Sequence, residues 1–278
     1  MRVFLLALAL GLLGCRGLAK MAAPSNIRNW SPDQAVLPYA EFRDQHITVH
    51  NVRHCRYFSD ESHVGQETYV VEHEDRSYDL DDLRGVDFFM IPFDNMPAIA
   101  HTMLSFEFTP PDRPPEYLAV SVEIRKEVGE EYAVWKGSAR QYELMYVLAD
   151  ERDVVGVRAN HRGENVYLYH TIATPEQARR LLVDVLGRTN ELAVRPEFYD
   201  TFANNCTTNI ARHINRIAPH RIRYDYRLLL PGYSDKLAYD EGLIESHGTF
   251  EETKAQAYVT PKAIMHAGRN DFSELIRR

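Results

Sequence analysis

The sequence lacks the features of a nucleic-acid-binding protein and of a protein with several membrane spans. Its 278 residues carry a formal net charge of −8, and no long basic run offsets that charge, so we expect no nucleic-acid partner. Beyond the N-terminus, no apolar stretch is long enough to cross a bilayer as a helix. Internal repeats and low-complexity tracts are also missing, which excludes repeat architectures and leaves an ordinary globular chain.

The N-terminus has the organisation of an export signal. Arg2 precedes the apolar run Val3–Leu13, which is too short to remain in a membrane. The run ends in Leu12-Leu13-Gly14-Cys15, which resembles a bacterial lipobox, although an ordinary secretory signal followed by a chance cysteine is the alternative. We expect a periplasmic location with a lipid anchor at Cys15. The predicted segments are a lipoprotein signal peptide (1–14), a tether (15–38) and a single domain (39–278).

Cysteine is scarce, since Cys55 and Cys206 are the only ones besides Cys15. In an oxidising compartment these two residues are candidates for a disulfide, which would make the protein a non-catalytic binding lipoprotein. The alternative is a catalytic Cys206. It lies in Asn204-Asn205-Cys206-Thr207-Thr208, where a loop gives way to a predicted helix. Free N–H groups and partial positive charge at a helix N-terminus favour a thiolate there.

The hydrophobic pattern predicts an α+β fold in which strands dominate the middle of the domain and helices come later. One helix follows the N-cap and first-turn proline of Thr174-Pro175, and a second follows Asn205 and ends before Pro219. The predicted strands are Ile47–Val52, Thr68–His73, Val86–Pro92, His101–Phe108, Glu116–Lys126, Tyr142–Ala149 and Asn165–Thr171.

A cysteine nucleophile needs a base and a group that orients the base, and the sequence offers twelve histidines. His213 lies about 10.5 Å along the helix axis from Cys206, too far to reach the thiol. His101 is a better candidate, because it begins a strand that a proline-rich turn joins to the strand containing Glu123. If this hairpin is symmetric about Asp112, the numbers of facing residues sum to 224 and His101 faces Glu123.

Cys206 precedes Ile210 by one helical turn and therefore lies on the face of the helix that packs inward. We expect that face to lie on the more polar face of the hairpin and to bring Cys206 to His101. Cys206, His101 and Glu123 would then be nucleophile, base and orienting group, and backbone N–H groups at the helix start would stabilise an oxyanion.

No metal or cofactor is predicted. His46, His50 and His54 recur every fourth residue, but their surroundings predict a strand, on which this spacing spans about 13 Å. That distance is too long for the three side chains to bind one ion.

Several short motifs together resemble a bacterial family, that of the Lnb N-terminal periplasmic domain, and the resemblance covers roughly residues 40 to 240. The stretches that carry it are Asn51-Val52-Arg53, Tyr78-Asp79-Leu80, His101-Thr102-Met103-Leu104-Ser105-Phe106, Ser121-Val122-Glu123-Ile124-Arg125, Tyr142-Glu143-Leu144 and Asn205-Cys206-Thr207-Thr208.

The order of histidine before cysteine is also similar to circularly permuted papain-like (NlpC-type) enzymes, in which an antiparallel sheet packs against the helix that carries the cysteine. The resemblance implies cysteine-dependent acyl transfer or hydrolysis on a lipid or lipoprotein ester, through a thioester on Cys206. A cysteine peptidase or amidase acting on cell-wall peptide is the alternative enzyme. The matching motifs add four supporting residues, which are Asn205, Thr207, Ser121 and Arg125. Unlike Lnb, this sequence has no multi-pass membrane region, so the substrate stays open.

Overall fold

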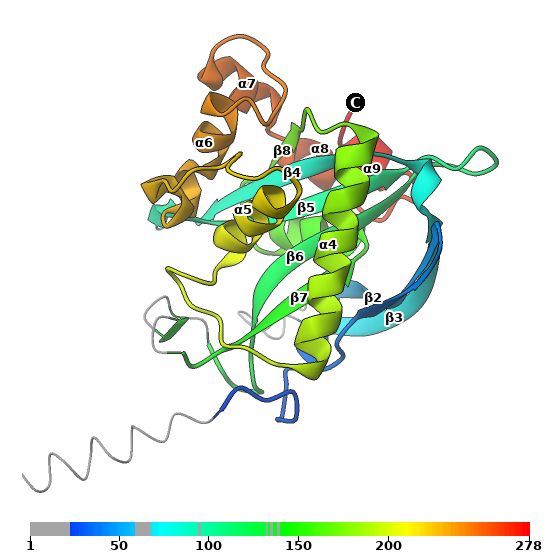
Figure 1. The fold of residues 1–278 in the computed structure, drawn as a ribbon, viewed down its shortest axis with the longest axis vertical. Helices are drawn as coiled ribbons and strands as arrows, with labels where there is room; N and C mark the ends of the chain where they lie inside the picture. The colour runs from blue at the N-terminus through cyan, green and yellow to red at the C-terminus, as the bar shows by residue number, and fades with distance from the viewer. Residues whose placement is uncertain (1–22, 59–67, 94–95, 132, 134–135, 138–139) are drawn as a thin grey trace, which may run out of the picture.

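The computed structural model describes residues 23–278 except 59–67, 94–95, 132, 134–135 and 138–139. It is an α+β fold in which helices cover both faces of a central sheet (Figure 1). The strands are β1 (Tyr39–Arg43), β2 (His46–Phe58), β3 (Thr68–Asp79), β4 (Leu83–Phe93), β5 (Met96–Phe108), β6 (Glu116–Arg125), β7 (Glu143–Ala149) and β8 (Tyr167–His170). All seven predicted strands are present, and β1 was not anticipated.

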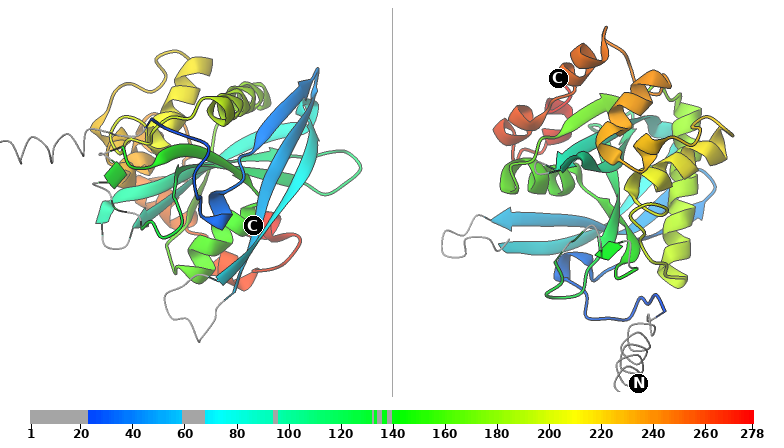
Figure 2. Two further views of the ribbon diagram at one scale, coloured as in Figure 1. Left: turned by 90° about the horizontal axis from the view of Figure 1, so that it is seen from below. Right: turned by 90° about the vertical axis from the view of Figure 1, so that its left-hand side faces the viewer.

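The sheet has eight strands in the order β1-β2-β7-β6-β5-β4-β8, and β3 pairs with β2 outside this path. Figure 2 shows the long β2 and β3 pair extending at one side of the molecule. Neighbouring strands are antiparallel except β2 and β7, which run parallel where Arg53 pairs with Ala149. The sheet is therefore mixed, whereas the prediction was an antiparallel sheet, and the difference lies in the single parallel pair of β2 and β7.

Side-chain alternation along the central strands builds two hydrophobic layers. Even-numbered residues such as Leu104 and Val120 belong to the layer that includes residues of α4 (Pro175–Val194) and α5 (Cys206–Ile217). Odd-numbered residues such as Met103 and Ala119 belong to the layer under α3 (Glu151–Gly156), α8 (Thr260–Met265) and α9 (Phe272–Leu275). Figure 1 shows α4 and α5 on one face of the sheet, with α8 and α9 on the other. Both faces of the predicted hairpin are therefore buried.

Local capping explains where the two predicted helices begin. Thr174 and Gln177 form a capping box at the start of α4, with Pro175 in the first turn. Asn205 and Thr208 form the same motif at the start of α5. The remaining helical segments are η1 (Pro32–Gln34), η2 (Leu80–Asp82), the π-helical turn η3 (Val157–His161), η4 (Tyr226–Leu228), η5 (Pro231–Tyr233), α6 (Ser234–Asp240) and α7 (Phe250–Gln256).

Residues N-terminal to β1, predicted to be part of a tether, contact the domain. The side chain of Asn26 donates hydrogen bonds to the carbonyls of Leu192 and Ala193 at the end of α4, and Trp30 is 7% exposed. The guanidinium of Arg125 lies over the Trp30 ring and donates to the carbonyl of Gln34. The packed part of the chain therefore begins before Tyr39, whereas Cys15 lies outside the described residues.

Candidate active site

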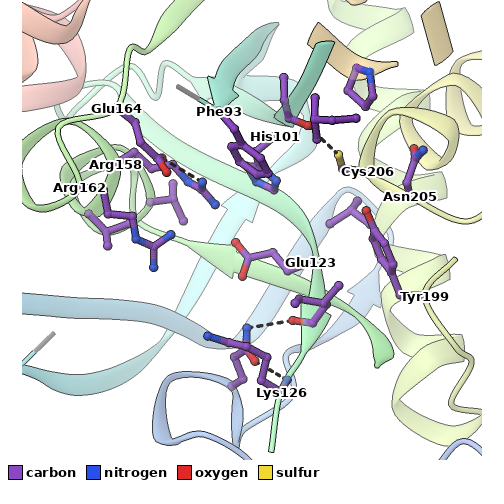
Figure 3. Close-up of a pocket in the computed structure, with 18 of the residues that line it drawn as sticks. Phe93, His101, Glu123, Lys126, Arg158, Arg162, Glu164, Tyr199, Asn205 and Cys206 are labelled. Atoms are coloured by element: carbon purple, nitrogen blue, oxygen red, sulfur yellow. Dashed lines mark hydrogen bonds and ion pairs between the residues drawn. The ribbon is translucent and has the colours of Figure 1, made fainter. Parts of the chain in front are cut away.

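The pocket that contains Cys206 lies where the sheet divides. β5 and β6 pair from Phe108 and Glu116 as far as Met103 and Ser121, and every facing pair sums to 224, as the turn symmetry predicts. Beyond that point β5 continues along β4 and β6 continues along β7. A pocket of about 410 Å³ opens between the diverging strands, and residues of β5, β6, α5, α3 and η3 line it. Figure 3 shows His101, Glu123 and Cys206 around this space.

His101 is connected to Glu123 through Ser121, in place of the direct contact that the register predicts. Nε2 of His101 lies 2.7 Å from Oγ of Ser121, and that hydroxyl donates a 2.8 Å hydrogen bond to Oε1 of Glu123. A serine hydroxyl has one proton, so Ser121 must accept its other hydrogen bond from Nε2–H of His101. The chain of hydrogen bonds therefore places the imidazole proton on Nε2 and leaves the lone pair on Nδ1.

Burial keeps His101 neutral, and the charges around the pocket keep Glu123 ionised. Burial lowers the pKa of His101 to about 3, and the positive charges of Arg158 and Arg162 outweigh the opposite effect of Glu123. Burial alone would raise the pKa of Glu123, but the nearby charge of Arg53, together with His101, Arg158 and the Ser121 hydrogen bond, lowers it to about 2. The structure therefore presents a neutral imidazole held by an ionised carboxylate.

Cys206 is the first residue of α5 and is 4% exposed. Its Sγ lies 3.9 Å from the carbonyl oxygen of Ala100, the residue directly before His101. Among the described residues, Sγ makes no hydrogen bond to the His101 ring, although both residues line the same pocket. We expected a hydrogen bond between Cys206 and His101. The structure instead places the two side chains in the lining of one pocket without that bond.

The predicted packing of α5 on the polar face of the hairpin was wrong. Oγ1 of Thr102 lies 3.1 Å from Oγ1 of Thr207, so α5 lies on the even-numbered face of β5. His101, Ser121 and Glu123 have odd numbers and belong to the opposite face. Cys206 and His101 line one pocket because the strands separate between them, which strand alternation alone does not predict.

Asn205, one of the predicted supporting residues, positions the start of α5. The side chain of Asn205 accepts from the N–H of Thr208 at 2.8 Å and donates to the carbonyl of Thr201 at 2.7 Å. Because this capping box uses the N–H groups of Asn205 and Thr208, those of Cys206 and Thr207 remain at the helix start. Arg125, also predicted to support the site, does not line the pocket and holds the N-terminal segment.

Sequence reasoning missed most of the charged side chains that line the pocket. The basic ones come from β2 (Arg53), from η3 and the residue that follows it (Arg158 and Arg162), and from the residue after β6 (Lys126). Arg158 is paired with Glu164 at 3.1 Å, and Arg53 makes a two-point contact with the buried Asp153. The charged residues lining the pocket are Arg53, Lys126, Arg158 and Arg162, together with Asp33, Glu123 and Glu164.

Cys55 and Cys206 are both free thiols, so the alternative of a Cys55–Cys206 disulfide is wrong. Cys55 lies on β2, where its backbone N–H donates to Asp153, and burial with the Asp153 charge raises the pKa of its thiol to about 12.

His213 contacts Tyr146 and Asp184 and does not line the pocket, in agreement with its exclusion as the base. Within the described part of the chain, no three His, Cys, Asp or Glu side chains form a group that could hold a metal.

Comparisons with known proteins give one family. No curated protein and no solved structure matches the sequence. No helix in the described ranges is long and apolar enough to cross a membrane. Residues 69–232 match the Lnb N-terminal periplasmic domain, and this region runs from within β3 past α5 and includes His101, Ser121, Glu123 and Cys206. Because the match spans more than half of the sequence, the chain belongs to the family of the Lnb N-terminal periplasmic domain.

Proposed function

We propose that the protein is a cysteine-dependent acyltransferase or thiol hydrolase that acts on a lipid or lipoprotein ester at the periplasmic face of the envelope. The observation that carries the proposal is that Cys206 and His101 line the same pocket. Cys206 lies at the start of a helix, and the hydrogen bonds through Ser121 to Glu123 leave the lone pair of His101 on Nδ1. Membership in the family supports a periplasmic role. A lipid anchor at Cys15 would hold the domain near its substrate.

The reaction proceeds in two halves. Nδ1 of His101 takes the thiol proton of Cys206 as Sγ bonds to the ester carbonyl carbon, and the same proton passes to the departing alcohol oxygen. An amine or water then attacks the thioester, gives its proton to His101 and releases the acyl group, and the proton returns to Sγ. The N–H groups of Cys206 and Thr207 at the start of α5 stabilise the oxyanion in both halves.

The low pKa of His101 has a consequence for this chemistry. The imidazole is neutral, as a base requires, but burial and the nearby charges of Arg158 and Arg162 make its protonated form unfavourable. A thiolate or oxyanion forming beside the ring would stabilise the imidazolium. We therefore expect proton transfer to be coupled to substrate binding.

One observation favours a second function, a cysteine amidase acting on cell-wall peptide. The pocket is lined by several charged side chains, including Lys126, Arg158 and Arg162. Such a lining fits carboxylates of a peptide better than an acyl chain. The same nucleophile and base would serve both reactions, so the substrate distinguishes them.

The test is to incubate the protein with a diacylated lipopeptide and to search for an acyl adduct on the Cys206 peptide by mass spectrometry. We expect a thioester that hydroxylamine removes, no adduct in Cys206→Ala, and a normal adduct in the matched control Cys55→Ser. Cleavage of cell-wall peptide without a lipid adduct would refute the action on a lipid ester and support the amidase. Absence of both activities in the folded protein would refute both.

Ser121 is a positioning residue and its variant has a distinct signature. Ser121→Ala removes the acceptor for Nε2–H of His101. We expect a lower kcat with little change in KM, smaller than the loss in His101→Gln, because general-base catalysis contributes about 10²–10⁴-fold in rate. A two-dimensional ¹⁵N NMR spectrum should show the Nε2–H tautomer in the wild type and a mixture in Ser121→Ala. An unchanged tautomer would contradict the role.

A further inference from the structure

A second cavity, separate from the cysteine pocket, lies between α5, α6 and the strands β4 and β5. Its volume is about 150 Å³, and nearly all of its surface is hydrocarbon. Cavities of this size in protein interiors accept ligands of about the size of benzene. The side chains that line it include Phe88, Leu104, Ile210, Ile214, Leu237 and Leu243.

The cavity follows α5 along most of its length. Thr207 lines it at the start of the helix, and Ile217 and Ala218 line it at the end. At 1.5 Å per residue, the far end is about 16 Å from Cys206 along the helix axis. Neither Cys206 nor His101 lines this cavity, so a ligand here is not placed for attack by the thiol.

Positive charge gathers where the cavity meets the end of α5. A neighbouring hollow shares Ala218 and Arg221 with the cavity and is also lined by Pro219, His220, Arg223 and Glu241. Arg221 donates to the carbonyls of Glu241 and Gly242 and lies 3.6 Å from the Glu241 carboxylate. Arg223 is exposed and makes no ion pair with the described residues. Arg180 donates to the last carbonyl of α5, at Ile217, which offsets the negative end of the helix dipole.

We propose that this cavity binds the hydrocarbon chain of a medium-chain carboxylate, with its carboxylate at the mouth beside Arg221 and Arg223. The apolar lining favours a hydrocarbon chain, because each methylene removed from water contributes about 0.8 kcal/mol to binding. The adjacent arginines favour a carboxylate at the end of that chain, because a guanidinium binds a carboxylate through two parallel hydrogen bonds. The size of the cavity limits the buried part to about six carbons.

The test is calorimetric titration of the purified protein with hexanoate, octanoate and decanoate, and with 1-octanol as the neutral probe. We expect one saturable site, with affinity rising up to about fourfold for each methylene until the cavity is full. Ala218→Trp should close the mouth and abolish binding, and Val194→Trp, on the exposed end of α4, should not. Absence of saturable binding with every probe, or full binding in folded Ala218→Trp, would overturn the site.

The role of positive charge at the mouth of the cavity is tested by substituting the exposed Arg223, since a change at an exposed residue should not disturb folding. Arg223→Glu should weaken octanoate about fivefold, the size of one surface ion pair, and leave 1-octanol unchanged. Arg43→Glu, exposed and outside both cavities, is the control. Equal effects on both probes would overturn the anionic end. Cys206→Ala should bind octanoate as the wild type does, and a loss of affinity would place the chain in the cysteine pocket instead.

Discussion

His101 should make the stability of this protein depend on pH in a way that one substitution removes. His101 is 7% exposed and neutral in the fold, and burial lowers its pKa from about 6.5 to about 3. Because the unfolded chain takes up a proton at a higher pH than the folded one, protonation favours unfolding. The stability associated with the neutral ring is complete above pH 6.5 and is lost as the pH falls toward 3.

The magnitude follows from the size of this shift. One proton taken up on unfolding lowers the free energy of unfolding by about 1.4 kcal/mol for each pH unit. Over the interval from about 6.5 to 3 the loss reaches several kcal/mol, which is a large part of the stability of a typical domain. Glu123, with its pKa lowered to about 2, adds a loss of the same sign below about pH 4.5.

His101→Gln is the perturbation, because the glutamine amide can still donate to Ser121 but does not titrate. Urea unfolding of both proteins, measured at intervals from pH 8 to pH 3.5, gives the difference in unfolding free energy. We expect the wild type to lose stability relative to the variant below pH 6.5, with a slope of about 1.4 kcal/mol per pH unit. A difference that does not change with pH would show that His101 titrates normally and would refute the buried neutral base.

Three further predictions concern the surroundings of the pocket. Iodoacetamide should label Cys55 only after unfolding, because burial raises the pKa of its thiol to about 12, and peptide mapping checks this. Gly232→Ala should lower the free energy of unfolding by about 1–3 kcal/mol, because a Cβ there would lie 1.9 Å from the carbonyl oxygen of Pro97, and thermal unfolding checks this. Asn205→Ala should cost about 1 kcal/mol or more by urea unfolding, since it loses the cap and the bond to Thr201.

The parts of the fold that depend on neighbouring residues could be predicted from the sequence. The proline-rich turn around Asp112 sets the register of β5 and β6, and the prediction of facing pairs that sum to 224 is confirmed. The start of α5 after Asn205 is also confirmed, because a capping box is a local motif. Both features need only a few residues of sequence to be recognised.

The division of the sheet could not be predicted in this way. It arises because β5 continues along β4 while β6 continues along β7, and those pairings are set by distant parts of the chain. The polar pattern of the hairpin was also misleading. His101 and Ser121 are buried under α3 and η3 and not exposed to α5. The polar residues of the hairpin therefore form an internal chain of hydrogen bonds, whereas we expected them to form the face that packs against the helix of Cys206.

The separation of β5 from β6 has a consequence for the proposed reaction. Cys206 belongs to the layer of α5, and His101 belongs to the layer of α3, so their approach depends on the opening between β5 and β6. The contact of Thr102 with Thr207 fixes α5 on one side of the opening, and the bond of His101 to Ser121 fixes the ring on the other. Both anchors lie where the strands begin to separate, and the pocket at this place is lined by both Cys206 and His101. Because Sγ of Cys206 makes no hydrogen bond to the His101 ring within the described residues, we expect Nδ1 to take the thiol proton only as the substrate binds, and not in a preformed ion pair.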